Sequence, residues 1–371
     1  MERCDALIVG GGPAGSSCAW QLNQHGLDVV VMDKASFPRD KVCAGWITPA
    51  VAEALQLDTD DYARQHVLQP ITAFRTGLID GDEVETRYPA TVSYGIRRRE
   101  MDDYLLQRSG ARLRLGEPLE SLRRDGAHWV INGAISAPLV IGAGGHFCPV
   151  ARFMGAKLGA TEPAIAAKEI EFEMTPAQRE DCRVRGDTPE LYFCADLKGY
   201  GWCFRKGNYL NIGLGREDNH LLSEQLRNFC DLLKQRGRIP QDIPDGFHGH
   251  AYLLYGHAVR KQLDDGMLLV GDAAGLAYPQ SGEGIRPAVE SGLLAADTII
   301  NAGGDYRRQQ LQPYADRLAA RFGSARPSGN AEPSSLRKFL AGKLLGNRWF
   351  TRHVVLDRWF LHANQAALRT V

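Results

Sequence analysis

The sequence has little of what marks several common classes of protein. Its 371 residues contain 44 Lys and Arg against 44 Asp and Glu, so the formal net charge is zero. No overall basic field argues for a nucleic-acid partner. No stretch approaches the roughly 20 consecutive apolar residues that a membrane-spanning helix requires. We therefore expect a protein without nucleic-acid partners and without a membrane span.

Metal and disulfide patterns are missing as well. The eight cysteines are scattered, without a Cys-x-x-Cys pair or a cluster of His and Cys. This scatter favours reduced thiols over disulfides and predicts no metal site. The first residues lack the basic segment, apolar core and cleavage site of a secretory signal peptide. The expected location is therefore the cytoplasm.

Glycine is abundant, and three glycines near the start have a recognisable arrangement. Residues 6–9 and 29–32 are typical of strands on either side of a helix, and Gly10, Gly12 and Gly15 between them have the G-x-G-x-x-G spacing. In such a unit the first glycine permits a tight turn and the second lets backbone approach a pyrophosphate. The third allows the helix to pack closely on the strand.

The residue that ends the second strand supports a dinucleotide site. Asp33 stands where a carboxylate can accept hydrogen bonds from a ribose hydroxyl. The complete strand–helix–strand unit with its acid therefore predicts dinucleotide binding. We assign Ala14, in the first turn of the helix, and Lys34, beside Asp33, to the same site. This segment alone does not separate NAD from FAD.

A second glycine-rich stretch lies near the other end of the chain. Residues 267–270 are typical of a buried strand, Gly271 and Asp272 follow it, and a long helix is predicted from about Gly284. A dinucleotide site assembled from both ends of a chain suits the bulk of FAD. Here the sequence resembles the FAD-dependent oxidoreductases of the p-hydroxybenzoate hydroxylase fold.

That resemblance implies roles for the residues of this second stretch. A Gly-Asp pair in the superfamily contacts the ribityl and phosphate region, which assigns Gly271 and Asp272. The backbone N–H groups of Gly282, Gly284 and Ile285 would face the pyrimidine edge of the flavin. A helix N-terminus aimed there stabilises negative charge on reduced flavin. Glu283 either tunes the charge at the flavin or faces solvent.

Two further pieces of the superfamily pattern can be compared. "RREMDDYL" resembles its R-x-x-F/M-D-x-x-L helix start, which implies that Arg98 faces the FAD pyrophosphate. "LVIGAGGHFCPVAR" fits only in part, because Gly144 and Gly145 stand where Asp-Gly is usual. Cys148 in the same turn is expected to be a packing residue.

The stretch "FPRDKVCAGWITP" points to one branch of the superfamily. It resembles the K-x-C-G-G segment of the geranylgeranyl reductase family, with Lys41, Cys43 and Gly45 matching and Ala44 in place of a glycine. The resemblance implies that residues 43–45 pass close to the flavin ring. Cys43 is accordingly our candidate catalytic residue, although a buried structural thiol is an equal alternative.

The stretch "GYGWCFRKGNYLNIGLG" carries a second match to this branch. Tyr200, Trp202 and Phe204 fit the family's Y-x-W-x-F-P signature, but Arg205 replaces the proline. On a strand, alternate residues point to one face, so the three aromatics share a face. That face either packs a core or lines an apolar cavity. The resemblance favours a substrate-binding role for these three residues.

The expected architecture is an α/β fold. A Rossmann-type FAD-binding domain would carry an inserted antiparallel-sheet substrate domain, like that of p-hydroxybenzoate hydroxylase, and would be followed by C-terminal helices. We predict strands near 166–174, 190–197 and 208–215 and helices over 176–181 and 220–237 in the substrate domain. The predicted bounds are 1–65, 96–159 and 259–325 for the FAD-binding domain, 66–95 and 160–258 for the substrate domain, and 326–371 for the C-terminal segment.

The C-terminal segment holds aromatic pairs among Arg and Lys. It predicts two amphipathic helices that either form a lid or rest on a membrane surface through residues 336–361.

Three functions remain open at this point. The first is a flavin reductase that delivers hydride from the flavin N5 to a C=C bond of an apolar, isoprenoid-like substrate. The second is a flavin monooxygenase using C4a-hydroperoxide chemistry on an aromatic or protein-bound substrate. The W-x-W-x-I-P pattern of tryptophan halogenases is missing, which disfavours halogenation. The third is a non-catalytic flavoprotein.

The sequence leaves the electron donor open. There is no second G-x-G-x-x-G segment in the sequence and hence no sign of a separate NAD(P)H domain. NAD(P)H docking transiently, a ferredoxin or a separate flavin reductase could each supply electrons.

Overall fold

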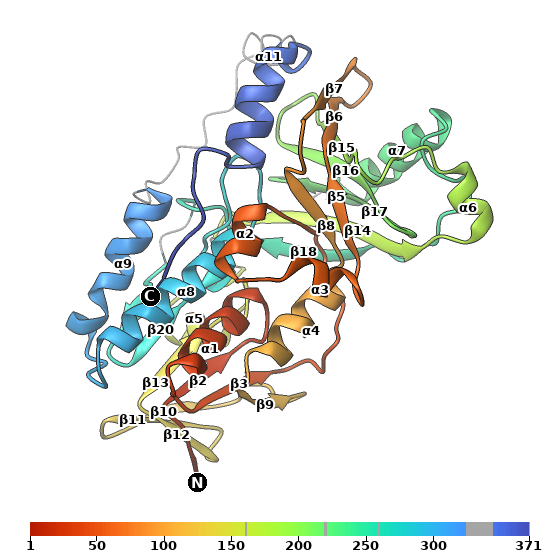
Figure 1. Ribbon diagram of the computed structural model, residues 1–371. Coiled ribbons are helices and arrows are strands. Elements are labelled where there is room, and N and C mark those ends of the chain that lie inside the picture. Colours follow the sequence, from red (N-terminus) through yellow and green to blue (C-terminus); the bar gives the residue numbers. More distant parts are fainter. Residues whose placement is uncertain (160–161, 219–220, 258–259, 324–343, 371) are drawn as a thin grey trace.

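A computed structural model describes residues 1–159, 162–218, 221–257, 260–323 and 344–370. Two sheets organise the chain, one in each half of Figure 1. Among these residues, none of the helices has both the length and the apolar character needed to cross a membrane.

The first sheet is the expected dinucleotide-binding sheet. Its strands follow the order β19 (Leu263–Asp264), β20 (Met267–Leu269), β13 (Leu139–Gly142), β2 (Ala6–Val9), β3 (Val29–Asp33) and β9 (Arg112–Leu115). All neighbours pair in parallel except β19 and β20. Each residue of β2 is buried, as expected for a central parallel strand covered on both faces.

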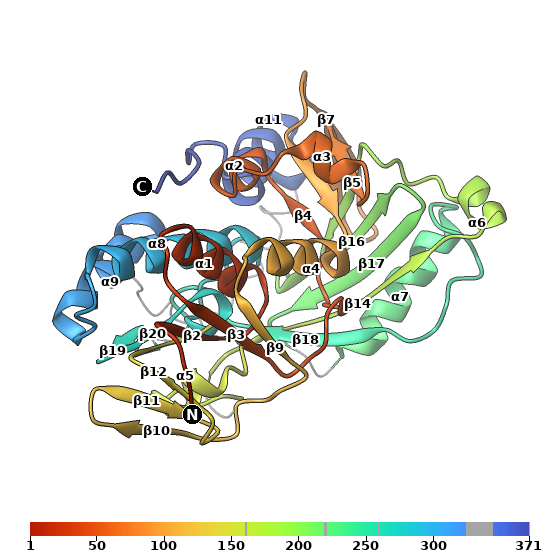
Figure 2. The same ribbon diagram turned by 60° about the horizontal axis from the view of Figure 1, so that its bottom comes forward.

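Layers on both sides cover this sheet (Figure 2). On one side α1 packs against α8 and α4, and α9 packs against α8. On the other side lies a small sheet, in which β11 contacts β13. The helices are α1 (Pro13–Gln24), α4 (Arg98–Arg108), α8 (Ile285–Asn301) and α9 (Arg308–Phe322), and the small sheet contains β1 (Glu2–Arg3), β12 (Ile135–Ala137), β11 (His128–Ile131) and β10 (Leu122–Asp125).

The second sheet has seven strands. Their order is β18 (His248–Tyr252), β14 (Ile165–Glu173), β17 (Tyr209–Arg216), β16 (Gly199–Lys206), β15 (Glu190–Phe193), β6 (Ala73–Leu78) and β7 (Glu83–Arg87). The expectation of an antiparallel sheet needs one correction, because β15 and β6 pair in parallel. These two strands come from separate parts of the chain, so no short hairpin forces them to be antiparallel.

The helices predicted for this region are present. They are α6 (Pro176–Asp181) and α7 (Leu222–Gln235). Apolar side chains of α7 pack with Ile170, Ile212 and Leu214 on one face of the second sheet. The opposite face is thereby left for the site. The predicted domain bounds themselves stay a prediction.

A third, short sheet forms where the chain passes from the first sheet to the second and back again. It consists of β4 (Trp46–Ile47), β8 (Ser93–Ile96) and β5 (Leu68–Ile71), and the short helices nearby are α2 (Pro49–Ala54) and α3 (Thr59–Ala63). Another short helix, α5 (Pro149–Phe153), follows β13. Cys148 caps α5 and is buried, as expected of a packing residue.

Residues 348–360, near the end of the chain, are helical, and residues 361–370 after them are irregular. The helix α11 (Arg348–Phe350) continues without a break into π-helical turns over Thr351–Phe360. Of the two amphipathic helices predicted over residues 336–361, the portion before residue 344 lies outside the described residues.

Candidate active site

A cavity of about 600 Å³ is lined by both ends of the chain and by the second sheet. We call it the cofactor cavity. Sixteen of the eighteen predicted binding residues line it: Gly10, Gly12, Ala14, Asp33, Lys34, Cys43, Ala44, Gly45, Arg98, Tyr200, Trp202, Phe204, Asp272, Gly282, Gly284 and Ile285. The other two, Gly15 and Gly271, do not line it. The structure therefore brings the predicted residues together, while their individual roles stay predictions.

Two helix N-termini meet at the cofactor cavity. Gly12 caps α1, which has a proline in its first turn, and Gly284 caps α8. Residues of both first turns line the cavity. The unpaired N–H groups and partial positive charge of a helix start favour anionic groups. One end of the cavity thus suits a pyrophosphate and the other suits the pyrimidine edge of a reduced flavin.

The glycines of the first loop test whether a dinucleotide fits. A Cβ added at Gly15 would lie 1.9 Å from the Gly10 carbonyl oxygen, so the protein's own packing excludes a side chain there. A Cβ at Gly12 would meet only the Arg39 guanidinium, at 3.5 Å. The protein therefore leaves free the space beside Gly12, which faces the cavity. This is the position where a pyrophosphate must approach the backbone, so the residues fit FAD.

Charged side chains hold the loops around this end. One oxygen of Asp33 accepts a hydrogen bond from the Gly11 N–H at 2.8 Å, and the other accepts one from the Ala35 N–H at 2.9 Å. Arg98 donates two hydrogen bonds of 2.8 Å to the buried Asp102. The predicted acid thus also fixes the backbone on which the cofactor would rest, whereas the predicted arginine pairs with an acid of its own helix.

The loop of residues 43–45 crosses the cavity wall. Burial raises the pKa of the Cys43 thiol, so it stays protonated at neutral pH. The Gly45 N–H donates to its sulfur at 3.4 Å. Gly45 has a φ of +70°, and a Cβ added there would lie 2.6 Å from the Nζ of the buried Lys206. Cys43 is accordingly a neutral thiol at the wall rather than a ready nucleophile.

The sequence left open whether Glu283 lies at the flavin or faces solvent. In the structure it lines the cofactor cavity. Burial raises the pKa of its carboxyl to about 7. The Arg286 N–H in the first turn of α8 donates to it at 2.6 Å. Glu283 can therefore hold a proton near neutral pH inside the cavity.

A second group of ionisable side chains lies near Asp272. Burial lowers the pKa of Lys41 to about 8. Its Nζ lies 2.9 Å from His250 Nε2, which in turn is 3.8 Å from Asp272 Oδ2. Burial lowers the pKa of His250, which is therefore neutral at neutral pH, so Lys41 is the group of this pair that offsets the negative charge of Asp272.

The three aromatic residues of β16 share the face that lines the cavity, as predicted. Each lies opposite a small or polar residue of β17, with Trp202 opposite Gly213 and Tyr200 opposite Gly215. A Cβ at Gly213 would lie 2.2 Å from the indole of Trp202. The indole therefore lies flat across β17, and the glycine makes room for it.

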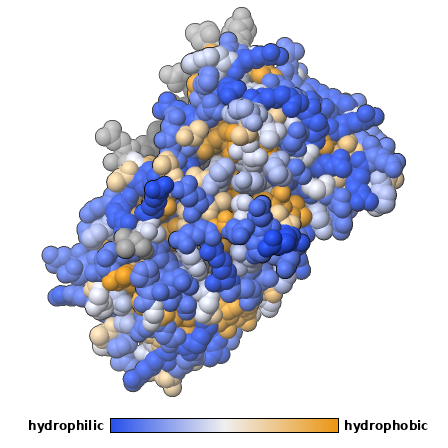
Figure 3. Space-filling view, in the orientation of Figure 1, coloured by the Kyte–Doolittle hydropathy of each residue, from blue (hydrophilic) through white to orange (hydrophobic). Residues whose placement is uncertain are grey.

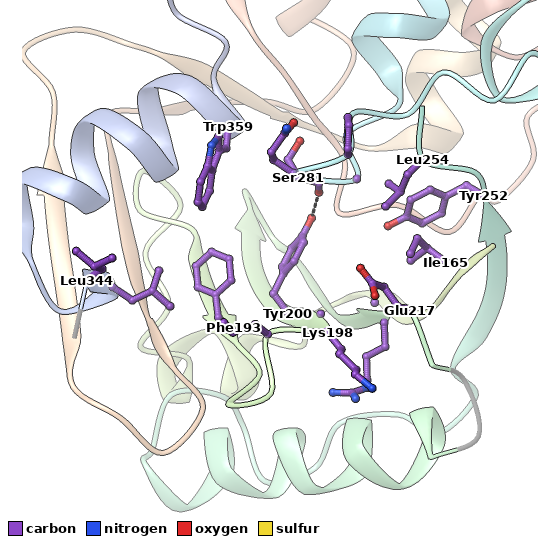
Figure 4. A pocket seen from close by; sticks show the side chains of 18 of the residues that line it. Ile165, Phe193, Lys198, Tyr200, Glu217, Tyr252, Leu254, Ser281, Leu344 and Trp359 are labelled. Atoms are coloured by element: carbon purple, nitrogen blue, oxygen red, sulfur yellow. Dashed lines mark hydrogen bonds between the residues drawn. The ribbon is translucent and has the colours of Figure 1, made fainter. Parts of the chain in front are cut away.

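A second cavity, of about 300 Å³, adjoins the first, and we call it the side chamber. Tyr200, Tyr252 and Gly282 line both cavities and form the partition between them. The Tyr200 hydroxyl donates to the Ser281 carbonyl at 2.5 Å across this partition (Figure 4). Most of the remaining wall is apolar: Ile165, Phe193, Leu197, Leu254, Leu344, Leu345, Phe350 and Trp359.

Charged residues complete the wall of the side chamber. Lys198 and Glu217 lie at one end of it (Figure 4), and the buried Arg216 lines it as well. The chamber therefore combines an apolar body with a polar end. It is not visible in any sequence motif, because its walls come from five strands (β14 to β18), the 279–282 loop and the C-terminal segment.

Sequence reasoning missed a buried polar cluster behind the 43–45 loop. It contains Glu169, Glu171, Lys206 and Asn211, which come from three adjacent strands of the second sheet. Lys206 is 1% exposed and donates to the Ala44 and Ile96 carbonyl oxygens, each at 2.9 Å. The alternation of Glu with Ile and Phe in the 169–172 stretch was the available signal.

Comparison with known proteins agrees with this geometry. The FAD binding domain family matches residues 3–317. Menaquinone reductase of Mycobacterium tuberculosis is 30% identical over 355 residues, which cover 88% of this chain and 83% of the relative. A digeranylgeranylglycerophospholipid reductase of Methanocaldococcus jannaschii is 26% identical over 328 residues and covers 84% and 81% of the two chains.

Solved structures show the same fold. A geranylgeranyl bacteriochlorophyll reductase-like protein from Thermoplasma acidophilum has a TM-score of 0.72 at 24% identity and covers 93% of this chain and 88% of its own. A halogenase in complex with FAD has a TM-score of 0.69 at 15% identity, with coverages of 97% and 85%.

The fold and the cavity define an FAD-dependent oxidoreductase, with FAD as its cofactor. Within that class, the chain belongs to the geranylgeranyl reductase family. The protein is thus an enzyme, and the hypothesis of a non-catalytic flavoprotein is not supported.

Proposed function

We propose that this enzyme reduces a C=C bond in an apolar, isoprenoid-like substrate. The observation that carries the proposal is the side chamber, an apolar space that meets the cofactor cavity at the partition formed by Tyr200, Tyr252 and Gly282. An extended apolar chain can lie in the chamber while one of its double bonds reaches past the partition. The names of the relatives specify a quinone and a geranylgeranyl lipid, which suits an apolar substrate.

When bound and reduced, FAD supplies a hydride to one carbon of the double bond. The protein then has to deliver a proton to the other carbon and to keep water out. The apolar wall of the side chamber excludes water. We assign the proton to Glu283, because its carboxyl lines the cofactor cavity beside Gly282 of the partition and has a pKa of about 7. Cys43, as a neutral thiol on the same cavity, is the alternative donor.

Exposed apolar residues near the side chamber suggest how such a substrate reaches it. Leu344 lines the chamber and is 44% exposed, and Trp349 nearby is 66% exposed. Arg348 and Arg352 flank this tryptophan in the sequence. Aromatic and basic residues together favour contact with a lipid surface. We therefore propose that residues 344–361 touch the membrane that holds the substrate.

The test is anaerobic reaction of the chemically reduced enzyme with geranylgeraniol as the probe. We expect the oxidised flavin spectrum to return and the product to gain two hydrogens for each reduced double bond. Ile165→Phe, which narrows the side chamber without touching the cofactor cavity, should slow the reaction of geranylgeraniol more than that of the shorter geraniol.

Reoxidation in air-saturated buffer tests the competing chemistry. Slow return of oxidised flavin in one phase is expected of the reductase. A transient species before the oxidised spectrum returns, together with no anaerobic reaction of either alcohol, would replace the proposal with a monooxygenase.

A further inference from the structure

Asn211 lies at the centre of the buried cluster between the second sheet and the cofactor cavity. It is 1% exposed. Its Oδ1 accepts a hydrogen bond from Trp202 Nε1 at 2.7 Å. Its Nδ2 donates to the Cys43 carbonyl oxygen and to Glu169 Oε2, both at 3.1 Å. One amide group thus connects an aromatic residue of the cavity wall with the 43–45 loop.

The direction of these bonds makes them depend on each other. An indole N–H can only donate, so the amide oxygen of Asn211 has to face Trp202. This orientation turns the amide nitrogen toward the Cys43 carbonyl, which can only accept. With the amide flipped, a donor would face a donor and an acceptor would face an acceptor. The bond from Trp202 therefore favours the orientation that the bond to Cys43 requires, together with Glu169 and Glu171, which accept from the same amide nitrogen.

Trp202 is placed where an occupant of the cavity would contact it. The indole lines the cofactor cavity and reaches diagonally from its partner Gly213 to Asn211 on the neighbouring strand. It packs across β17 on one side and faces the cavity on the other. A ligand that shifts the ring would pull the donor away from Asn211.

The 43–45 loop has two anchors that do not involve Trp202. The Ile96 N–H donates to the Gly45 carbonyl oxygen at 2.8 Å. Lys206 holds the Ala44 carbonyl and is itself paired with Glu171 at 2.6 Å. The carbonyl of Cys43 is held by Asn211. One end of the loop is therefore fixed to the sheet, and the other is linked to the aromatic wall.

We propose that Asn211 is a positioning residue that couples the indole of Trp202 to the 43–45 loop. A substrate that displaces the indole thereby loosens the loop that lies beside the cofactor. The proposal rests on the proposed function only for what occupies the cavity. The coupling itself is a property of the protein before substrate binds.

The thiol of Cys43 reports on this coupling in the FAD-free protein. It is half-buried, whereas the other seven cysteines are buried. We would measure iodoacetamide labelling of each cysteine by peptide mapping, together with amide hydrogen exchange over residues 41–47. Trp202→Phe keeps a ring but removes the N–H, and Asn211→Ala removes the whole link. Each should speed Cys43 labelling roughly tenfold, which corresponds to one lost hydrogen bond.

A matched control lies on the same strand. Tyr209→Phe removes a surface hydrogen bond from Tyr209 to Glu173 and should leave Cys43 labelling unchanged. If the link is a single path, the double variant Trp202→Phe/Asn211→Ala labels no faster than Asn211→Ala alone.

Three results would overturn the proposal. Trp202→Phe could label Cys43 within twofold of the wild-type rate, or the two substitutions could act additively. The third result is that Cys203 of β16 and Cys194, just after β15, become reactive alongside Cys43, which would indicate general loosening of the second sheet. A change confined to Cys43 supports the coupling even if neither alcohol is reduced, so failure of the proposed function is distinguished from failure of this inference.

Discussion

The two large sheets hold the cofactor cavity by different means. The dinucleotide-binding sheet presents mainly backbone, through helix starts at Gly12 and Gly284. The seven-stranded sheet presents side chains, with aromatics and a buried polar cluster on one face. A site made of backbone groups requires glycines, which have no side chain to block the ligand. A site made of side chains requires residues from distant segments that come into contact only when the chain folds. Figure 3 shows apolar atoms gathered toward the middle of one face, where the two halves adjoin.

The largest effect should come from breaking the backbone site. Gly15→Ala places a Cβ against the Gly10 carbonyl and should lower the free energy of unfolding by more than about 4 kcal/mol. Gly12→Ala has room in the protein, so its stability without FAD should match wild type while FAD binding is lost. Urea unfolding of the FAD-free proteins measures their stability, and the flavin-to-protein ratio after purification measures FAD binding. Equal destabilisation by both variants would contradict the distinction drawn between these glycines.

The next effect tests the side-chain site. Lys206→Met removes the hydrogen bonds to two carbonyl oxygens in the interior and one of the two cations beside Glu171, which keeps its pair with Arg97, and should cost about 3–5 kcal/mol in urea unfolding. Lys261→Met, at a surface ion pair with Asp264, is the matched control and should cost less than about 1 kcal/mol. A similar loss in the free energy of unfolding for both variants would show that the buried cluster contributes no more to stability than a surface ion pair.

These two contrasts explain how much the sequence could predict. The glycine spacing of the first loop and the alternation of Tyr200, Trp202 and Phe204 are local patterns, so a dinucleotide site and a shared aromatic face followed from them. The fold class, FAD and most lining residues followed from the resemblance of several motifs to a known superfamily. Asn211 carries no such pattern, because its role arises from a diagonal contact between strands and a loop more than 160 residues away. Likewise, the parallel pairing of β15 and β6 depends on distant chain segments.

A pH series sharpens the comparison further. Burial raises the pKa of Glu169 to about 8 from an ordinary value of 4.5. Between these two pH values the folded protein keeps a proton that the unfolded chain loses, so the free energy of unfolding falls as pH rises. The slope contributed by this group is at most about 1.4 kcal/mol per pH unit. Glu169→Gln should flatten the dependence between about pH 4.5 and 8, and an unchanged slope would mean that Glu169 is ionised in the folded state.

A smaller effect concerns catalysis. The pKa of about 7 at Glu283 predicts that product formation falls above about pH 7, as the carboxyl loses its proton. Glu283→Gln should lower the rate at pH 6 by roughly 100-fold and remove this dependence. Glu180→Gln, on the exposed surface of α6, is the control. A Glu283→Gln enzyme that keeps the wild-type pH profile would transfer the role to another group, with Cys43→Ser as the next variant.

The smallest effect is expected at the surface. Trp349→Ser should weaken sedimentation with anionic phospholipid vesicles by severalfold without changing stability, because its side chain is 66% exposed. Phe153→Ser, at an exposed aromatic residue of the dinucleotide-binding half, is the control and should have no effect on vesicle binding. Equal binding by all three proteins would remove the membrane contact from the proposal.

The origin of the cofactor cavity in both ends of the chain has a consequence during synthesis. Gly10 leaves the ribosome early, whereas Ile285, on the opposite wall, follows some 275 residues later. A nascent chain can form its first strands and helix long before the flavin end of the cavity exists. A chain that ends before residue 272 therefore lacks the part of the cavity wall that residues 272–288 supply.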